Sequence, residues 1–251
     1  MFKIFDTKIS PILLYGSEIW GINCYQCVDS VHFFACKQFL DVQSSTCNDT
    51  VMGDLARYPM QIYSAKRCVK YWVRLLSMTN DRYIKLCYNM LVHYDNLGYR
   101  NWATGIRENL CLNGFGYVWE AQCVNNPKLF LIQYLNRLKD QYMQIWRSRC
   151  EINKKLSLYL QYKTTFTKET YVSSINIAKF RSLFASFRDS SHSLSIETGR
   201  HHGIERDNRS CPYCDYYIED EYHFVMICPL YNNIRSNYIR NSFTANPSVF
   251  F

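Results

Sequence analysis

The sequence predicts a mainly α-helical protein in which a multi-helix bundle is followed by a small metal-binding subdomain. Only 9 Gly and 6 Pro occur among 251 residues, which favours long helices over a turn-rich β fold. Apolar residues make up 48% of the chain, and in most segments they recur at helical intervals of three and four. The C-terminal part differs, because Cys and His gather there at metal-site spacing.

Helix signals follow one another along the chain. Pro11 suits the first turn of a helix within residues 1–20, and the Ser-Ser-Thr string before residue 47 offers N-caps for the next. Gly98 ends a third amphipathic stretch, and Asn126-Pro127 is a cap followed by Pro at the first helical position. The helices expected from such signals span residues 1–20, 45–57, 60–78, 82–97, 101–113, 126–162 and 174–187. We expect Trp102 and Trp119 to be core anchors rather than base-stacking platforms.

One early segment imitates a metal site. It is the string C-x2-C-x4-H-x3-C formed by Cys24, Cys27, His32 and Cys36. Its last spacing is one residue short of a retroviral-type zinc knuckle, and it lacks the glycines that such a knuckle uses for tight turns. Because its apolar residues also follow a helical period, we interpret the segment as a helix with core or half-buried thiols.

Positive charge is unevenly distributed. The net charge is +8, and residues 127–170 hold 9 Lys/Arg against 3 Asp/Glu. A second basic row lies in the amphipathic helix expected at 60–78. Either row could track a phosphate backbone, and either could merely solvate the outer face of a helix. The candidate phosphate contacts are Lys66, Lys70, Arg74, Arg147, Arg149, Lys154 and Lys155.

The helix expected from Asn126 to about Tyr162 carries a heptad-like seam. Its members are Leu131, Leu135, Leu138, Tyr142 and Ile145, with a continuation to Tyr159. Such a seam could pack within this chain or pair with another one. Residues 164–170 are polar and form the best candidate for a domain boundary, so the expected domains are 1–163 and 171–251. In the helix at 174–187, the inward face is expected to be Ile177, Phe180, Phe184 and Phe187.

The strongest motif is C-x2-C-x8-H-x4-C, formed by Cys211, Cys214, His223 and Cys228. Three thiols and one imidazole within eighteen positions are what a tetrahedral structural zinc site requires. Asp220 is the expected N-cap of a helix carrying His223, and Cys228 should lie where that helix ends before Pro229. We therefore predict a zinc-knuckle subdomain with bound Zn²⁺, preceded by an extended piece at 194–200. A final helix to about residue 241 should cover it, with Ile234, Tyr238 and Phe243 inward.

The motif also resembles a known family. The strings C-P-x-C, E-D-E-Y-H-F and I-C-P-L-Y-x-x-I-R are similar to the zinc-knuckle segment after the reverse transcriptase domain of non-LTR (LINE-type) retrotransposons. Glu197-Thr-Gly-Arg200 and Tyr15-Gly-Ser-Glu-x-Trp20 resemble the same family, so the likeness spans nearly the whole chain. It implies that residues 1–163 correspond to the helical thumb region after the polymerase palm, and that an upstream polymerase half is a partner.

No Asp-Asp pair occurs anywhere in the chain. Nucleotide transfer by two metal ions needs paired carboxylates, and the resemblance puts that pair upstream, so we expect this chain to have no polymerase activity on its own. The four zinc ligands fill every coordination position and leave none for catalysis. The expected function is therefore a non-catalytic C-terminal part of an RNA-directed DNA polymerase that binds template RNA or target DNA. A helical protein-interaction module with a zinc-stabilised docking tail is the alternative.

The twelve cysteines bear on the compartment. The sequence has no run of eighteen apolar residues and no recognisable secretory signal. We therefore expect reduced thiols and metal ligands rather than disulfides, an intracellular location in nucleus or cytoplasm, and no membrane partner.

Overall fold

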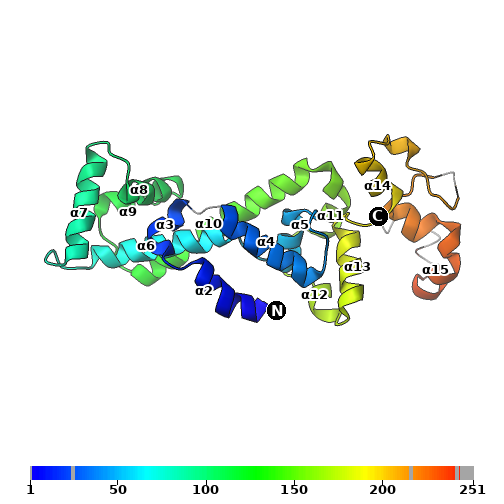
Figure 1. Cartoon of the computed structure of the whole chain (residues 1–251), viewed down its shortest axis with the longest axis horizontal. Helices are drawn as coiled ribbons and strands as arrows, with labels where there is room; N and C mark the ends of the chain where they lie inside the picture. The colour runs from blue at the N-terminus through cyan, green and yellow to red at the C-terminus, as the bar shows by residue number, and fades with distance from the viewer. Residues whose placement is uncertain (1, 24–25, 215–216, 241–242, 244–251) are drawn as a thin grey trace. The chain divides into compact units, whose positions relative to one another are not determined.

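The computed structural model describes residues 2–23, 26–214, 217–240 and 243, and within them the chain is helical with a single isolated β-bridge. The predicted mainly α-helical fold is confirmed. The chain divides into two compact units (Figure 1). Unit 1 comprises Met1–Phe39 and Leu55–Arg149, and unit 2 comprises Leu40–Asp54 and Cys150–Phe251. None of the described helices is long and apolar enough to cross a membrane.

Unit 1 is built mostly from long α-helices joined by short turns. Two of its helices, α4 and α10, continue to the first residues of unit 2. The elements are α1 (Phe2–Ile4), the π-helical η1 (Phe5–Ile9), α2 (Ser10–Leu13), α3 (Ser17–Trp20), the 3-10 turn η2 (Gly21–Asn23), α4 (Gln26–Leu40), α6 (Met60–Leu76), α7 (Tyr83–Asn96), α8 (Trp102–Leu112), α9 (Gly116–Ala121) and α10 (Pro127–Ile152).

Unit 2 is built from shorter helices and helical turns. The short α5 comes from the first stretch of the unit and the rest from the second. They are α5 (Asn48–Leu55), η3 (Lys154–Leu156), α11 (Ser157–Tyr162), α12 (Tyr171–Ser174), α13 (Ala178–Arg188), α14 (Ser195–His201), η4 (Arg206–Asn208), the π-helical η5 (His223–Ile227), η6 (Pro229–Tyr231) and α15 (Asn232–Tyr238).

The core of unit 1 forms around α6. Trp72 is fully buried and stacks on Trp119 with ring centroids 5.8 Å apart. Its indole N–H donates to the Tyr88 hydroxyl at 2.9 Å, which satisfies the one polar atom that burial would otherwise leave unpaired. The predicted role of Trp119 as a core anchor is confirmed, and Trp102 packs at the edge of the same cluster.

Helix caps in unit 1 are made by residues next to the helix ends. Asn101 caps α8 by accepting from the Ala103 N–H at 2.8 Å, while Thr104 accepts from the Asn101 N–H at 2.9 Å. Gly98 follows α7 with φ +89°, a left-handed conformation that an L side chain rarely adopts. The expected single helix at residues 1–20 is instead interrupted, because Gly16 takes φ +66° between α2 and α3.

The helix predicted over 126–162 is broken. Helix α10 ends at Ile152, and Asn153 takes an extended conformation in which its side chain accepts from the Lys155 N–H at 3.1 Å. This capping bond starts a new turn at η3. The predicted seam is confirmed only in part. Leu131 and Leu138 pack against the core and Tyr159 is buried, but Ile145 is 49% exposed. The buried side chains of α10 are Phe130, Tyr134, Trp146 and Cys150.

Unit 2 has a polar centre. The carboxylate of Asp54 is buried and accepts from the Tyr171 hydroxyl at 2.7 Å and from the Arg188 guanidinium at 3.3 Å. Arg188 also pairs with Glu169 at 3.1 Å, and Glu169 pairs with the buried Lys163 at 2.7 Å. We call these five residues the buried ionic cluster. It joins the short first stretch of unit 2 to the second.

The cluster explains two departures from expectation. In α13 Arg188 is drawn inward, and the predicted inward face is only partly confirmed. Ile177 and Phe180 are 59% and 56% exposed, whereas Phe184 packs on Tyr171 with ring centroids 5.0 Å apart. The predicted boundary at 164–170 lies inside unit 2, close to the Lys163–Glu169 ion pair. Independent folding of residues 171–251 stays a prediction.

Candidate metal centre

The first two cysteines lie on a hairpin-like loop. A β-bridge joins Ser210 to Ile218, and the Cys211 N–H donates to the Tyr217 carbonyl at 2.8 Å. These bonds close the loop that carries Cys211 and Cys214. The predicted Cys-Pro-Tyr-Cys turn is therefore part of a short loop, and the Ser210–Ile218 bridge holds the two ends of this loop together. This pairing keeps both cysteines next to the helix that follows.

That helix begins as the sequence predicts. The carboxylate of Asp220 accepts from the His223 N–H at 2.8 Å, which confirms its role as N-cap. From His223 to Ile227 the helix is π-helical rather than α-helical, and the Cys228 N–H donates to the His223 carbonyl at 2.8 Å. Cys228 then turns to an extended conformation before Pro229, as predicted.

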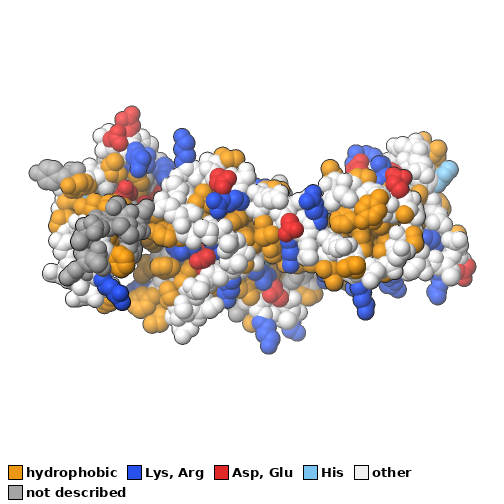
Figure 2. Space-filling view, turned by 180° about the vertical axis from the view of Figure 1, so that it is seen from behind, with side chains coloured by type: hydrophobic (Ala, Val, Ile, Leu, Met, Phe, Trp, Pro, Cys, Tyr) orange, Lys and Arg blue, Asp and Glu red, His pale blue; other side chains and the backbone are white. Residues whose placement is uncertain are grey.

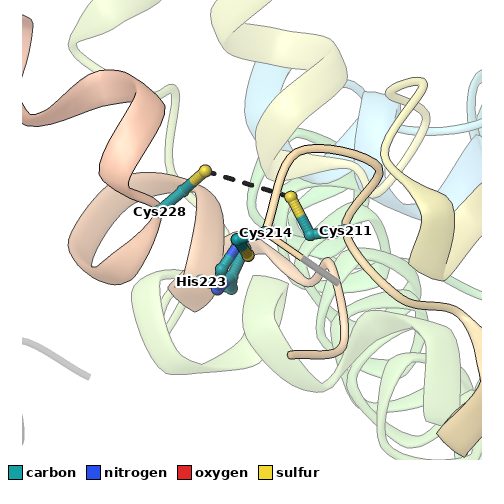
Figure 3. A group of neighbouring side chains, drawn as sticks. All are labelled: Cys211, Cys214, His223 and Cys228. Carbon is teal, nitrogen blue, oxygen red and sulfur yellow. Dashed lines mark hydrogen bonds between the residues drawn. The ribbon is translucent and has the colours of Figure 1, made fainter. Parts of the chain in front are cut away.

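The four side chains meet at one point (Figure 3). Their ligand atoms all lie within 4.8 Å of one another. The Sγ atoms of Cys211 and Cys228 are 3.9 Å apart, and the Sγ of Cys214 lies 3.4 Å from Nε2 of His223. Ligands at the usual zinc distances of about 2.0–2.3 Å occupy tetrahedron corners roughly 3.3–3.8 Å apart. The group Cys211, Cys214, His223 and Cys228 is therefore placed to hold a metal ion such as zinc.

Burial distinguishes this group from a surface cluster of cysteines. Cys211 and Cys228 are each 1% exposed and His223 is 2% exposed. Burial, followed by the neighbouring Cys211 thiol, raises the pKa of the Cys228 thiol. A buried thiolate therefore needs a cation to compensate its charge, and zinc supplies that charge when it binds.

One residue that supports the centre was not anticipated. Arg235 in α15 is 8% exposed; it donates to the Val225 carbonyl at 2.7 Å and to the Cys228 carbonyl at 3.0 Å. These are carbonyls that the end of a helix leaves unpaired. The expected inward face of this helix is wrong, because Ile234 and Tyr238 are 58% and 85% exposed. A single arginine in a short helix carries no sequence signal for such a role.

The N-terminal string that imitates a metal site forms none among the described residues. Cys24 lies outside them, and Cys27 is exposed on α4. Nε2 of His32 accepts from Arg57 at 3.2 Å. Burial raises the pKa of the Cys36 thiol to about 12, which keeps it neutral. The interpretation as a helix with core thiols agrees with this placement, and none of the described cysteines forms a disulfide.

The candidate phosphate contacts fall on three elements. On α6, Lys66 is half-buried and Lys70 and Arg74 are exposed. On α10, Arg147 is half-buried and Arg149 exposed. Lys154 and Lys155 lie in η3 of unit 2. Lys and Arg side chains are distributed singly or in small groups over the face drawn in Figure 2.

No family model matches the chain, and neither a curated protein nor a solved structure matches it. The resemblance to non-LTR reverse transcriptases therefore depends on the residues quoted above and stays an expectation.

Proposed function

We propose that this chain is a non-catalytic, zinc-stabilised region of a non-LTR retrotransposon reverse transcriptase that binds RNA or DNA. The Cys3His group carries the proposal, because its four residues are those of the family-like motif and their ligand atoms lie within 4.8 Å of one another. All four coordination positions are taken by protein, which suits a structural ion and leaves no site for substrate. The polymerase half is proposed to lie on the upstream polypeptide.

The basic residues of α6 support nucleic-acid binding. Lys66, Lys70 and Arg74 recur every four residues along one side of the helix, as contacts to a phosphate backbone would. None of the three pairs with a carboxylate within the described part of the chain. Their charges are therefore available to a polyanion, in keeping with a net charge of +8.

A titration of the zinc-loaded chain tests this function. Fluorescence anisotropy with labelled single-stranded RNA and DNA should reveal binding whose affinity falls with salt. The logarithmic slope would reach about −5 if all seven candidate cations each neutralise one phosphate. No affinity for either polymer at low salt would reject the proposal.

A charge-reversal pair locates the contact. Lys70→Glu with Arg74→Glu should weaken binding about tenfold and flatten the salt slope by about 1.4. Lys3→Glu with Lys8→Glu is the matched control, because both lysines are exposed in unit 1 and the charge change is equal. An equal loss of affinity in both variants would mean that net charge alone is responsible for the binding.

A helical protein-interaction module is the second candidate. It is favoured by the apolar side of α7 and its C-cap residue Leu97, where Tyr83, Met90 and Leu97 are 86%, 57% and 58% exposed. Apolar surface of this kind often marks a contact with another protein. Light scattering after size exclusion separates the candidates, because only this one requires a stable partner or self-association.

A further inference from the structure

Unit 2 contains a basic pocket beside the metal centre. Its volume is about 630 Å³, and it lies between the η3–α11 segment on one side and α14 with η4 on the other. Five cationic side chains from these elements and the hairpin line it. They are Lys154, Lys155, Arg200, Arg206 and Arg209. Because these residues are spread over more than fifty positions of the sequence, no local run of charge predicts that they lie together.

The carboxylates that share the pocket already have partners. Glu197 is 3% exposed and pairs with Lys155 at 3.1 Å and with Arg200 at 2.7 Å. Glu221 bonds His192 at 3.0 Å, and Asp220 caps the helix of the metal centre. Acidic groups at this wall are therefore engaged with neighbours rather than left to repel an incoming anion.

Three of the cations have no acidic partner among the described residues. Lys154 and Arg206 are exposed at the pocket rim. Arg209 bonds only backbone carbonyls, Ile204 at 2.7 Å and Ile196 at 2.9 Å. Its side chain is fixed by these bonds while its positive charge remains uncompensated. An anion in the pocket would supply the missing negative charge.

The pocket is preorganised by α14 and by the metal-binding hairpin. A Cβ at Gly199 would lie 2.7 Å from Cγ of Arg209, so only glycine lets the arginine stem pack this closely on the helix. The Ser195 N–H and hydroxyl donate to the Glu219 carboxylate at 2.7 and 2.6 Å. Glu219 also accepts from the Ile196 N–H through its carbonyl at 3.0 Å. The hairpin that carries two metal ligands thus holds α14 at the pocket wall.

We propose that this pocket binds a phosphodiester of single-stranded nucleic acid, with Lys154 and Arg206 as the direct phosphate contacts. Arg209 contributes its fixed positive charge from the wall, and Glu197 acts as a positioning residue for Lys155 and Arg200. An open pocket lets a continuous strand enter and leave, and Tyr222 gives its lining an aromatic side chain suited to a base. This proposal rests on the proposed function and assigns it a site.

Charge reversal at the two direct contacts provides the first test. Anisotropy is measured with the zinc-loaded full chain and a labelled twenty-nucleotide oligouridine. Lys154→Glu with Arg206→Glu should weaken binding about tenfold and reduce the logarithmic salt slope by about 1.4, which corresponds to two single-strand phosphates. The matched control is Lys168→Glu with Lys179→Glu, two exposed lysines of unit 2 outside the pocket. The control should change affinity less than about threefold.

Chemical protection of the unmutated chain provides a test that does not depend on folding of a variant. Lys154 should be acetylated at least fivefold more slowly in the presence of the oligonucleotide, while Lys168 should be unaffected. Inorganic phosphate at the same total phosphate concentration should protect neither lysine. Protection of Lys154 by inorganic phosphate alone would overturn the assignment to nucleic acid in favour of a small-anion site.

The outcomes separate the two proposals. If the oligonucleotide does not bind the unmutated chain, the proposed function itself is wrong. If the oligonucleotide binds but Lys154 stays unprotected, only the assignment to the pocket is wrong. The same holds if both charge-reversal pairs lower the affinity equally.

Discussion

The backbone N–H of Cys228 donates to the carbonyl of His223 at 2.8 Å and closes an i→i+5 turn. In an α-helix two residues five apart do not share a face. The wider π turn adds one residue per hydrogen-bonded ring, so His223 and the residue after the helix both reach the loop thiols. The H-x4-C spacing of the motif is thereby matched to a π-helical segment.

Insertion of Ala after Ile227 tests this match. It would place the fourth ligand at the i+6 position, which a helical turn carries away from the face of His223 and from the loop thiols. We expect zinc affinity to fall at least tenfold, measured by competition with a chromophoric chelator. Ile227→Ala keeps the length of the segment and should bind zinc as the unmutated chain does.

Cys211→Ser should remove the metal and unfold the region from about Ile196 to the C-terminus. Structural zinc sites contribute on the order of 10 kcal/mol to folding, which is comparable to the whole stability of a small domain. Hydrogen exchange should accelerate in peptides from 196–240 and stay unchanged in α6 and α8. Cys111→Ser, at an exposed position, is the control. Faster exchange throughout unit 1 would contradict the prediction.

His32 should make the stability of unit 1 depend on pH. Burial, together with the positive charge of Arg57, lowers its pKa to about 4 from an ordinary 6.5. His32 therefore binds a proton in the unfolded chain at a pH where it stays neutral in the folded chain. Stability is lost as the pH falls from about 6.5 to about 4. A shift of this size corresponds to about 3 kcal/mol. Urea unfolding at pH 7 and pH 4 should reveal this loss of stability. The loss should be smaller in the His32→Gln variant and unchanged in the His93→Gln control.

Asp189 should destabilise unit 2 as the pH rises. Its side chain is fully buried, and burial with the nearby Asp54 charge raises its pKa well above the ordinary range although the Arg188 charge opposes this shift. A raised pKa in the folded state means that stability is greatest below the unfolded pKa near 4 and falls towards the folded pKa. Asp189→Asn cannot ionise, so its melting temperature should depend less on pH between 5 and 8. Asp207→Asn, an exposed site, should leave the wild-type dependence intact.

Asn101→Ala should destabilise unit 1 by about 1 kcal/mol, because it removes the N-cap of α8. The same side chain also donates to the Leu91 carbonyl at 2.9 Å, which ties α8 to α7. Chemical unfolding followed by circular dichroism measures the change. Asn89→Ala, on the exposed side of α7, should stay within about 0.5 kcal/mol of the unmutated chain.

Local rules predicted the metal group and several helix ends well. Capping at Asn126 and Asp220 and the position of Cys228 before Pro229 depend on neighbours within a few residues, so the sequence contains the information. The four metal ligands were recognisable for the same reason, since all lie within eighteen positions of one another.

Departures from expectation arise where distant residues decide the outcome. The apolar pattern of α13 pointed to Phe180, yet Phe180 is 56% exposed and Arg188 turns inward to the buried carboxylate of Asp54. Residues 194–200 were expected to be extended, whereas Ser195 bonds the Glu219 carboxylate and starts α14. Neither partner can be identified from helical periodicity, because each comes from a separate part of the chain.

The buried ionic cluster also sets an order of events during synthesis. Tyr171 and Arg188 bond Asp54 across 117 and 134 residues. The ribosome must therefore synthesise the chain through Arg188 before these bonds can form, whereas the local helical contacts of α6 to α9 can form much earlier. Until then the Asp54 carboxylate at the end of α5 lacks the Arg188 guanidinium as its counter-ion.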